Sequence, residues 1–356
     1  MERIDIKSMD MKELQSFIEA MGEKKFRAKQ LYSWMHQKLV TDFDEMTNLS
    51  KAFRDRLKEK CSLGGVQIRR EQISKKDGTR KFLMELSDGN MVETVLMKYH
   101  HGNSVCVSSQ VGCRMGCRFC ASTVGGLTRS LATSEILDQI YEIERHIGER
   151  VSNVIIMGIG EPLDNYENVI RFIRMLSDEN GLHISQRNIT LSTCGLVPKI
   201  YDLMREELTI TLAISLHAPN DEIRREMMPV ANRFSMNEIM DACRKYIEET
   251  GRRITFEYTM VQGTNDSREN ALELAARLRG MLCHVNLIPL NAVEGRMGHR
   301  SVPENIRQFQ SVLECHHINV TIRREMGSDI DAVDNCAIKI ADIAASLILL
   351  AFLGTL

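Results

Sequence analysis

Four of the ten cysteines in this 356-residue chain lie between residues 106 and 120, in the stretch CVSSQVGCRMGCRFC. Cys113, Cys117 and Cys120 have C-x3-C-x2-C spacing, and Cys106 precedes this triplet. A structural zinc site normally takes four ligands in two pairs, and no second pair lies nearby in the sequence. Thiolates also hold iron–sulfur clusters, where four cysteines complete a 4Fe-4S cube. Three ligands on one short loop would leave one iron open to a substrate, whereas unrelated buried cysteines rarely cluster in this way.

Polar residues also follow several strand-like runs at the point where each run ends. The motif MGIGEP comes directly after SNVII, and the motifs LSTCG, ISLHAP and LIPLN close three later runs. Active sites of α/β proteins gather at the carboxyl ends of parallel strands. Each motif alone is weak, since a Gly-Glu-Pro turn is often only a turn. Together they predict one bound ligand, held by Gly160, Glu161, Ser192, Ser215, Leu216, His217 and Asn291.

The elements that would position these residues change in character near residue 100. Before it, residues 9–22 and 25–40 have helical spacing of apolar residues, and residues 79–99 alternate like a β-hairpin with SDGN as its turn. After it, strand-like runs alternate with helical stretches, which predicts a parallel sheet with helices outside. We therefore expect an α/β fold with a partial (β/α)6-type barrel. The expected division is an N-terminal helical module plus hairpin (1–95), a barrel core (96–332) and a tail (333–356).

Composition places the chain among ordinary globular proteins. It is 43% hydrophobic with a formal net charge of −2. No secretory signal opens the chain, and the apolar run at 343–356 is shorter than the ~20 residues that a membrane span needs. We therefore expect a cytoplasmic protein without a membrane partner, whose cysteines are free, metal-bound or catalytic.

One charge cluster stands out from this near-neutral background. Residues 51–81 contain eleven Lys and Arg against four Asp and Glu. Such a run is either a solvated helix face or a surface for a polyanion such as RNA. We expect the second from Arg54, Arg56, Lys58, Lys60, Arg69, Arg70, Lys75, Lys76, Arg80 and Lys81.

The cysteine triplet, the early strand and the β/α series together resemble the radical S-adenosylmethionine (SAM) superfamily. The resemblance implies a 4Fe-4S cluster on Cys113, Cys117 and Cys120, with SAM as the second cofactor chelating the open iron. Within that superfamily, residues from about 15 to 332 resemble the RlmN-type RNA adenine-C2 methyltransferases. The shared motifs include CVSSQVGCRMGCRFCAS, IMGIGEPLDNYENV, AISLHAPNDEIRREMMPV and VTIRREMGSDIDA.

That family resemblance also implies a reaction. Members first methylate one of their own cysteines near the C-terminus, and a second SAM supplies the radical that activates this methyl group. The methylene then adds to C2 of an adenine. By this resemblance, Cys106 attacks the resulting protein–RNA link and forms a transient disulfide, and Glu93 in MVETV acts as a proton acceptor. A base must lie within hydrogen-bond reach of its proton.

The tail departs from the family pattern. Members read Asp-Ile-Asp-Ala-Ala-Cys-Gly-Gln-Leu-Arg, which would place the methyl-carrying cysteine at position 334, where this chain has Asp334. The nearest thiol is Cys336, an uncertain stand-in. The codons TGT GGA CAA CTG CGC GAT AAA encode Cys-Gly-Gln-Leu-Arg-Asp-Lys, and the next frame gives Val-Asp-Asn-Cys-Ala-Ile, the residues at 333–338. We hypothesise that residues 333–356 are translated out of frame and that this chain methylates RNA poorly.

The resemblance further implies 23S rRNA and tRNA as substrates, and we expect an electron donor such as flavodoxin and a monomeric state. Three other functions remain open at this point, the third being a radical SAM enzyme that acts on a small molecule or a protein. The sister family methylates C8 of the same adenine and typically shows Gly-Glu-Ala where this chain has Gly160-Glu161-Pro162, which favours C2. The second alternative is a non-catalytic iron–sulfur or zinc protein that binds RNA.

Overall fold

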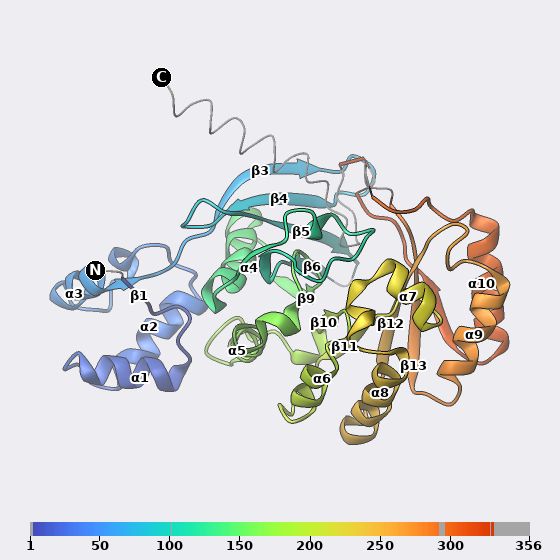
Figure 1. Ribbon diagram of the computed structural model, residues 1–356. Coiled ribbons are helices and arrows are strands. Elements are labelled where there is room, and N and C mark those ends of the chain that lie inside the picture. Colours follow the sequence, from blue (N-terminus) through green and yellow to red (C-terminus); the bar gives the residue numbers. More distant parts are fainter. Residues whose placement is uncertain (1–2, 101, 292–295, 328, 331–356) are drawn as a thin grey trace.

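The computed structural model describes residues 3–100, 102–291, 296–327 and 329–330. Its centre is a ten-stranded sheet with the order β14-β13-β12-β11-β10-β9-β6-β5-β4-β3. From β6 to β14 all neighbouring strands are parallel, and from β3 to β6 they are antiparallel. The curved sheet and its outer helices (Figure 1) confirm the predicted partial barrel. The strands are β3 (Gln67–Ile73), β4 (Arg80–Glu85), β5 (Met91–Tyr99), β6 (Gly102–Val107), β9 (Val151–Ile156), β10 (Ile189–Thr193), β11 (Thr211–Ser215), β12 (Ile254–Met260), β13 (Cys283–Pro289) and β14 (Asn319–Ile322).

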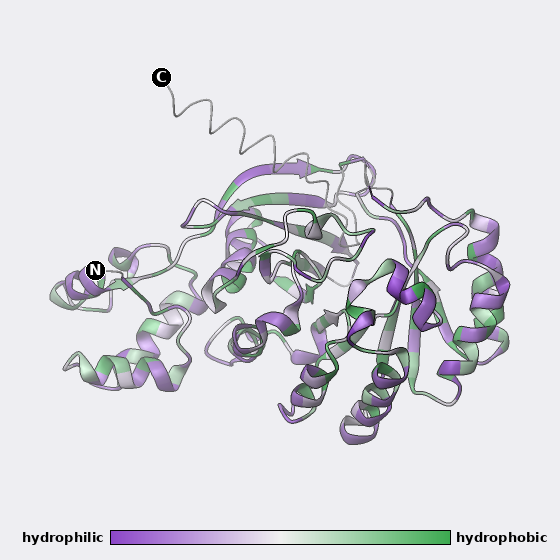
Figure 2. Cartoon of the chain, viewed as in Figure 1, coloured by the Kyte–Doolittle hydropathy of each residue, from purple (hydrophilic) through white to green (hydrophobic). Residues whose placement is uncertain are grey.

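The helices of the barrel cover the outer face of the parallel strands, because each carries an apolar stripe on one side. Ser235 and Glu238 form a capping box at the start of α8, and Gly251 ends it in the left-handed conformation. In Figure 2 hydrophilic residues mark much of the peripheral helices α8 and α10. The helices are α4 (Thr133–Ile147), α5 (Tyr166–Ser177), α6 (Val197–Met204), α7 (Asp221–Met227), α8 (Met236–Thr250), α9 (Arg268–Leu278) and α10 (Pro303–Cys315).

A small helical module precedes the sheet and packs against α4. Lys7 and Asp138 form a buried ion pair of 2.7 Å, and His36 Nδ1 lies 2.8 Å from the Tyr141 hydroxyl. Leaving either partner of a buried ion pair alone is costly, so these contacts fix the module on the barrel. The module comprises β1 (Ile4–Asp5), α1 (Met11–Ala20), α2 (Phe26–His36), the short helix η1 (Phe43–Glu45), α3 (Lys51–Lys60) and β2 (Cys61–Ser62).

The predicted hairpin exists as β4 and β5, but it belongs to the barrel sheet. Strand β5 pairs with β6 from Val95 opposite Cys106 to Tyr99 opposite Gly102. The boundary predicted between residues 95 and 96 therefore falls inside a strand. Strand β3, which pairs with β4 at the sheet edge, was not predicted, since its sequence QIRREQI has few apolar residues.

The chain after β14 crosses to the opposite edge of the sheet. We call residues 323–327, 329 and 330 the closing segment. Its Gly327 N–H donates to Asp77 Oδ2 (2.9 Å), and its Asp329 accepts from the Ser74 hydroxyl (2.6 Å) and the Lys75 N–H (2.9 Å). These bonds tie the last parallel strand to the β3–β4 turn. Residues 333–356, including Asp334 and Cys336, lie outside the described residues.

Within the described residues, no helix combines the length and the apolar character required to cross a membrane.

Candidate active site

The three clustered cysteines lie on a loop whose base is a small β-ladder. Strands β7 (Gln110–Gly112) and β8 (Leu127–Ser130) pair antiparallel, and the Cys113 N–H donates to Gly126 O at 2.9 Å. At the loop's far end, the Thr123 hydroxyl donates to the carbonyls of Cys117 (3.1 Å) and Cys120 (3.0 Å). The loop therefore presents its three thiols from a braced backbone. We call residues 113–126 the cluster loop.

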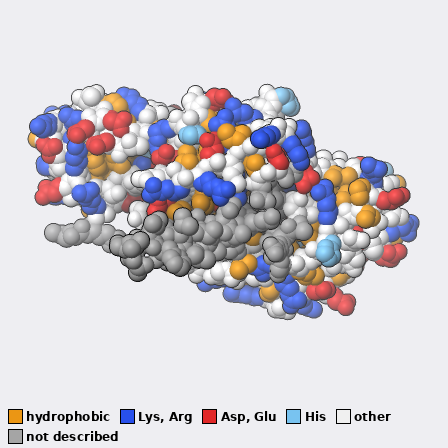
Figure 3. All heavy atoms as spheres, turned by 90° about the horizontal axis from the view of Figure 1, so that it is seen from above, with side chains coloured by type: hydrophobic (Ala, Val, Ile, Leu, Met, Phe, Trp, Pro, Cys, Tyr) orange, Lys and Arg blue, Asp and Glu red, His pale blue; other side chains and the backbone are white. Residues whose placement is uncertain are grey.

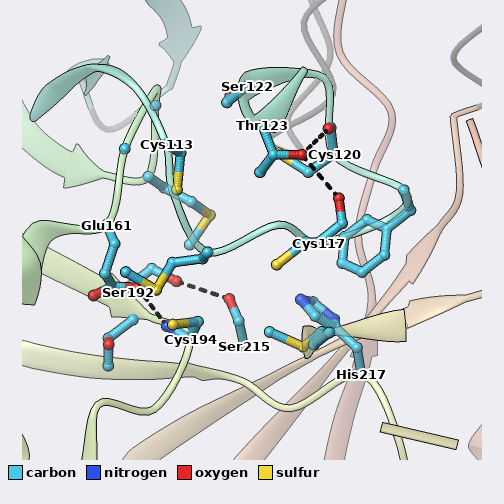
Figure 4. A pocket seen from close by; sticks show the side chains of 17 residues that line it. Cys113, Cys117, Cys120, Ser122, Thr123, Glu161, Ser192, Cys194, Ser215 and His217 are labelled. Carbon is cyan, nitrogen blue, oxygen red and sulfur yellow. Dashed lines mark hydrogen bonds between the residues drawn. The ribbon is translucent and has the colours of Figure 1, made fainter. Parts of the chain in front are cut away.

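All three cysteines line one cavity at the carboxyl ends of the parallel strands. Figure 4 shows Cys113, Cys117 and Cys120 above this cavity, with Ser192, Ser215 and His217 below it. The Ser192 and Ser215 hydroxyl oxygens lie 3.4 Å apart, at the ends of adjacent strands β10 and β11. The predicted residues that line the cavity are Cys113, Cys117, Cys120, Gly160, Glu161, Ser192, Ser215 and His217.

Glu161 is a carboxylate buried at the cavity wall. Its Oε2 accepts from the Cys194 N–H at 2.7 Å, and its Oε1 accepts from the Leu163 N–H at 3.0 Å. Burial raises the pKa of Glu161, and these backbone hydrogen bonds oppose the rise only in part. A buried carboxylate at this place is therefore suited to a ligand that brings its own positive charge.

His217 follows β11 with a left-handed backbone (φ 56°) and is also buried. Its Nδ1 accepts from the Thr259 N–H at 3.0 Å, so the neutral ring carries its proton on Nε2. Burial, followed by the charge of Arg224, lowers the pKa of His217 to about 3. The Phe119 ring meets the imidazole edge-on at 5.0 Å. His217 thus offers a neutral hydrogen-bond donor beside the cluster loop.

Gly160 allows the β9 end to approach the start of the cluster loop. It has φ 107°, and a Cβ there would lie 2.6 Å from the Gln110 Cβ and 2.8 Å from the Ser109 hydroxyl. No L side chain fits that conformation and that space. The Glu161 N–H then donates to Gln110 Oε1 at 2.9 Å, which fixes the strand end that carries the buried carboxylate.

Glu93 and Cys106 lie on the inner face of the barrel, on strands β5 and β6. Glu93 is buried and pairs with Lys81 at 3.1 Å. Cys106 lies opposite Val95, so Glu93 is its diagonal neighbour, at roughly 7–8 Å between Cα atoms. Cys106 also lies beside Ile155 of β9, two residues before Met157, which lines the cavity. The structure therefore brings these two residues together, beside the strand whose end lines the cavity.

Two predicted ligand-binding residues do not line this cavity. The Leu216 side chain is in the hydrophobic core, and its N–H donates to Glu257 O at 3.0 Å. Asn291 lies with Arg300 and Arg323 in a separate small cavity beyond the end of β13. Their roles in binding SAM stay predictions.

The sequence analysis did not predict some of the residues that line the cavity, and it predicted one buried lysine to be at the surface. Thr193 and Cys194 also line the cavity, and their place at the end of β10 is the signal that could have found them. The prediction that Lys81 contributes to a basic surface is wrong, because its side chain is 4% exposed and pairs with Glu93 inside the barrel.

The donor set fits a 4Fe-4S cluster. Three thiols from one braced loop line the same cavity, and soft thiolates are the ligands that such clusters take. A buried guanidinium nitrogen close by, Arg224 Nη1, has no hydrogen-bond partner among the described residues. When bound, the cluster supplies a single electron, while the residues described above would bind and orient the second ligand.

Comparisons with known proteins agree with this geometry. A family model described as "Radical SAM superfamily" matches residues 107–275, and one described as "Ribosomal RNA large subunit methyltransferase N-terminal domain" matches residues 4–63. The fold and the three-thiol cavity define the chain as a radical SAM enzyme, a class that uses a 4Fe-4S cluster and SAM. The chain belongs to the RlmN family of methyltransferases within that class.

The relatives that show this family cover nearly the whole chain. A "Probable dual-specificity RNA methyltransferase RlmN" from Lachnoclostridium phytofermentans is 59% identical over 331 residues, 93% of each chain. Its counterpart from Lachnospira eligens is 61% identical over 327 residues, 92% of this chain and 93% of that one. The crystal structure of a radical SAM methyltransferase from Sphaerobacter thermophilus has 42% identity and a TM-score of 0.90, over 94% of this chain and 98% of that chain.

Proposed function

We propose that this chain is built to methylate C2 of an adenine in 23S rRNA and in tRNA, through a methyl-cysteine and two molecules of SAM. The observation that carries the proposal is the placement of two sets of residues side by side. The thiol triplet, Glu161 and His217 line one cavity, and Cys106, the diagonal neighbour of Glu93, lies beside strand β9, whose end leads to that cavity. A methyl carrier near Cys106 would meet both SAM and the adenine.

In this proposal the cavity residues divide between the two cofactors. Cys113, Cys117 and Cys120 hold the cluster, and the Glu161 carboxylate takes the ammonium of SAM. The neutral Nε2–H of His217 donates to SAM. Further contacts to SAM are assigned to Gly160, Ser192, Ser215, Leu216 and Asn291.

Glu93 and Cys106 act on the adenine and on the protein–RNA link. The buried ion pair with Lys81 holds the Glu93 carboxylate in one orientation, as a proton acceptor requires. Cys106 packs near Ile330 of the closing segment, in a small apolar group with Val95 and Met97. Position 334 follows Ile330 by four residues, so its Cα can be at most about 14 Å from that of Ile330. A cysteine there would be within reach of Cys106.

This chain has Asp334 at the position of the family's methyl-carrying thiol, and Cys336 two residues later. Two residues of extended chain displace a thiol by up to about 7 Å, while a displacement of about 1 Å can cost a catalytic group roughly 100-fold in rate. We therefore expect the protein to bind its cofactors and cleave SAM but to methylate RNA poorly.

The experiment uses anaerobically reconstituted protein with SAM, a reductant and RNA. Wild type, Asp334→Cys and Cys336→Ser are compared for 2-methyladenine formed and for reductive SAM cleavage without RNA. We expect Asp334→Cys to yield roughly 100-fold more 2-methyladenine than wild type, with Cys336→Ser no lower than wild type. Equal yields from Asp334→Cys and wild type would contradict the tail hypothesis. Formation of 8-methyladenine would contradict C2 chemistry.

The out-of-frame hypothesis has a direct check in the gene. The neighbouring reading frame after Ala332 should encode Cys-Gly-Gln-Leu-Arg-Asp-Lys. If no other reading frame of the gene encoded that sequence after Ala332, the out-of-frame hypothesis would be refuted.

The RNA-binding part of the proposal is assigned to the N-terminal module, with the barrel mouth holding one unstacked adenine. Ion pairs limit its basic surface: Arg56 pairs with Glu23, Lys58 with Asp44, and Arg69 with Glu85. Figure 3 shows positive and negative side chains intermixed over this end of the molecule. We also propose an electron donor such as flavodoxin, a monomeric state and a cytoplasmic location.

A further inference from the structure

Arg224 on α7 is the largest of the fully buried side chains, with no exposed surface. An arginine is almost never buried to this extent unless a partner compensates its charge. Among the described residues, no carboxylate lies within ion-pair distance of its guanidinium, and its Nη1 has no hydrogen-bond partner. The Arg224 charge is therefore uncompensated by the described part of the chain.

The other nitrogens of the guanidinium hold two strand ends of the SAM cavity. Nη2 donates to Cys194 O at 2.6 Å, after β10, and Nε donates to Leu216 O at 3.3 Å, after β11. Cys194 lines the cavity, and so does His217, the residue after Leu216. Arg224 thus lies directly behind the wall that faces the three thiols.

Helix α7 is also attached to the cluster loop. The Arg118 N–H, between Cys117 and Cys120, donates to Met227 O at 2.9 Å, and Pro229 would contact a Cβ at Gly116 at 3.4 Å. Met228, the residue after α7, lines the cavity. The loop that carries the thiols and the helix that carries Arg224 therefore pack together.

The electrostatic surroundings agree with this placement. Burial lowers the pKa of Arg224, and the thiolate forms of Cys194 and Cys117 are the two largest influences that raise it. Cys117 is one of the three cluster cysteines, and its thiolate is negative when it binds iron. A 4Fe-4S cube with three thiolates is an anion, and reduction adds one further negative charge.

We propose that Arg224 is the buried counter-charge of the cluster and a positioning residue for the cavity wall. Its positive charge stabilises the reduced cluster more than the oxidised one, so it makes the electron transfer that precedes SAM cleavage easier. The inference rests on the proposed function only in so far as the three thiols hold a cluster. It does not depend on the RNA substrate or on the tail.

The first test measures the reduction potential of the cluster by spectroscopic titration, without SAM or RNA. Arg224→Gln keeps a hydrogen-bond donor but removes the charge, and Arg224→Lys keeps the charge. We expect Arg224→Gln to lower the equilibrium constant for reduction at least tenfold, a shift of about 59 mV to more negative potential. Arg224→Lys should stay closer to wild type. Arg225→Gln, at the exposed next residue, is the matched control and should change nothing.

A wild-type potential in Arg224→Gln, or equal shifts in Arg224→Gln and Arg224→Lys, would overturn the proposal. If Arg224 only held the strand ends together, the reduction potential would not depend on whether the substituted side chain is charged or neutral. The expected order is wild type, then Arg224→Lys, then Arg224→Gln, from the most to the least easily reduced.

The second test covers a variant that fails to retain the cluster. Melting temperatures are measured for cluster-free and cluster-loaded protein. Because ligand binding stabilises the native state, the cluster should raise the melting temperature more in wild type than in Arg224→Gln. A variant that folds without the cluster but cannot retain it supports the counter-charge. A cluster-free Arg224→Gln protein that is unfolded, while cluster-free wild type is folded, identifies a structural brace and overturns the proposal.

These results are separable from failure of the proposed function. If wild type assembled no 4Fe-4S cluster, the proposed function itself would fail. If wild type assembled the cluster and cleaved SAM while Arg224→Gln kept the wild-type potential, this inference alone would fail.

Discussion

At the scale of single residues, the site combines a buried acid and a buried base whose ionisation is shifted in opposite directions. Burial raises the pKa of Glu161, and it lowers that of His217 to about 3. Both shifts favour the uncharged side chain while the cavity holds no ligand. A ligand with an ammonium group would reverse the preference at Glu161 and leave His217 as a neutral donor.

The first prediction concerns Glu161→Gln. The substitution keeps the shape of the side chain but removes the charge that we propose pairs with the ammonium of SAM. A hydrogen bond to a charged group contributes about 1.5–3 kcal/mol, so SAM affinity should fall roughly 10- to 100-fold. Equilibrium binding to cluster-loaded protein measures this, with Ser267→Ala on the capping box of α9 as a control. Unchanged affinity would exclude Glu161 from SAM binding.

The same variant tests the raised pKa through stability without SAM. The ordinary pKa of a glutamate is 4.5, and in the folded protein that of Glu161 lies higher. Its contribution to stability is therefore complete below 4.5 and is lost as the pH rises through the folded-state value. Glu161→Gln has no such titration. We expect its melting temperature relative to wild type to rise as the pH rises above 4.5, and a constant difference would contradict the shift.

At the scale of elements, the closing segment completes a sheet whose edge strands do not pair with each other. On the β3–β4 turn, the Asp77 carboxylate accepts a hydrogen bond from the Gly327 N–H, and the Ser74 hydroxyl and the Lys75 N–H donate to Asp329. Burial alone would raise the pKa of Asp77, but hydrogen bonds from Gly327 and Thr79 lower it to about 2. Asp77 is therefore a charged acceptor at neutral pH, which strengthens the bond across the gap.

The second prediction is that Asp77→Ala and Asp329→Ala loosen this connection without unfolding the parallel strands. Hydrogen exchange of the amides at 74–79 should become faster, because the turn loses its acceptors, while amides of β12 keep their protection. Asp202→Ala, at a half-buried residue of α6, is the control. Unchanged exchange at 74–79 in both variants would show that the closing segment does not hold the turn.

Much of this arrangement of elements could be predicted from the sequence. The parallel strands are apolar runs between clear turn signals, and the residues that line the cavity follow them directly. Strand β3 could not be recognised, because an edge strand exposed on one face has no apolar pattern to show. A two-residue period also predicts a strand but not its partner, so β5 was expected in a separate hairpin. Asn291 was expected in the cavity with the thiols but lies in a separate one. Its position depends on the geometry of the loop after β13, which no sequence motif encodes.

At the scale of the whole molecule, the N-terminal module is joined to the barrel through buried polar contacts. Besides the Lys7–Asp138 ion pair, the Ser134 hydroxyl donates to Asp5 at 2.7 Å and the Ser134 N–H donates to Ser8 at 2.9 Å. Removing residues 1–90 would also remove β3 and β4 from the sheet. A test of RNA binding should therefore change surface charges and not delete the module.

The third prediction concerns two lysines at the ends of α3. Lys51 and Lys60 are exposed, and removing one lysine–phosphate interaction lowers the salt dependence of binding by about one unit of slope. Lys51→Glu with Lys60→Glu should weaken RNA binding and reduce that slope, while SAM cleavage stays unchanged. Lys245→Glu on α8, exposed and remote from the module in Figure 1, is the control. If the double variant bound RNA as tightly as wild type, the RNA would have to bind elsewhere on the protein.

The bonds between the closing segment and the β3–β4 turn join residues separated by 250 to 255 positions along the chain. During synthesis, the early hairpin leaves the ribosome long before its last partner is made. Contacts of such long range form late and leave edges exposed in the meantime. The nascent protein must therefore leave the β3–β4 edge of the sheet without these bonds until Gly327 and Asp329 have been made. A chaperone that shields strand edges would be expected to raise the yield of folded protein.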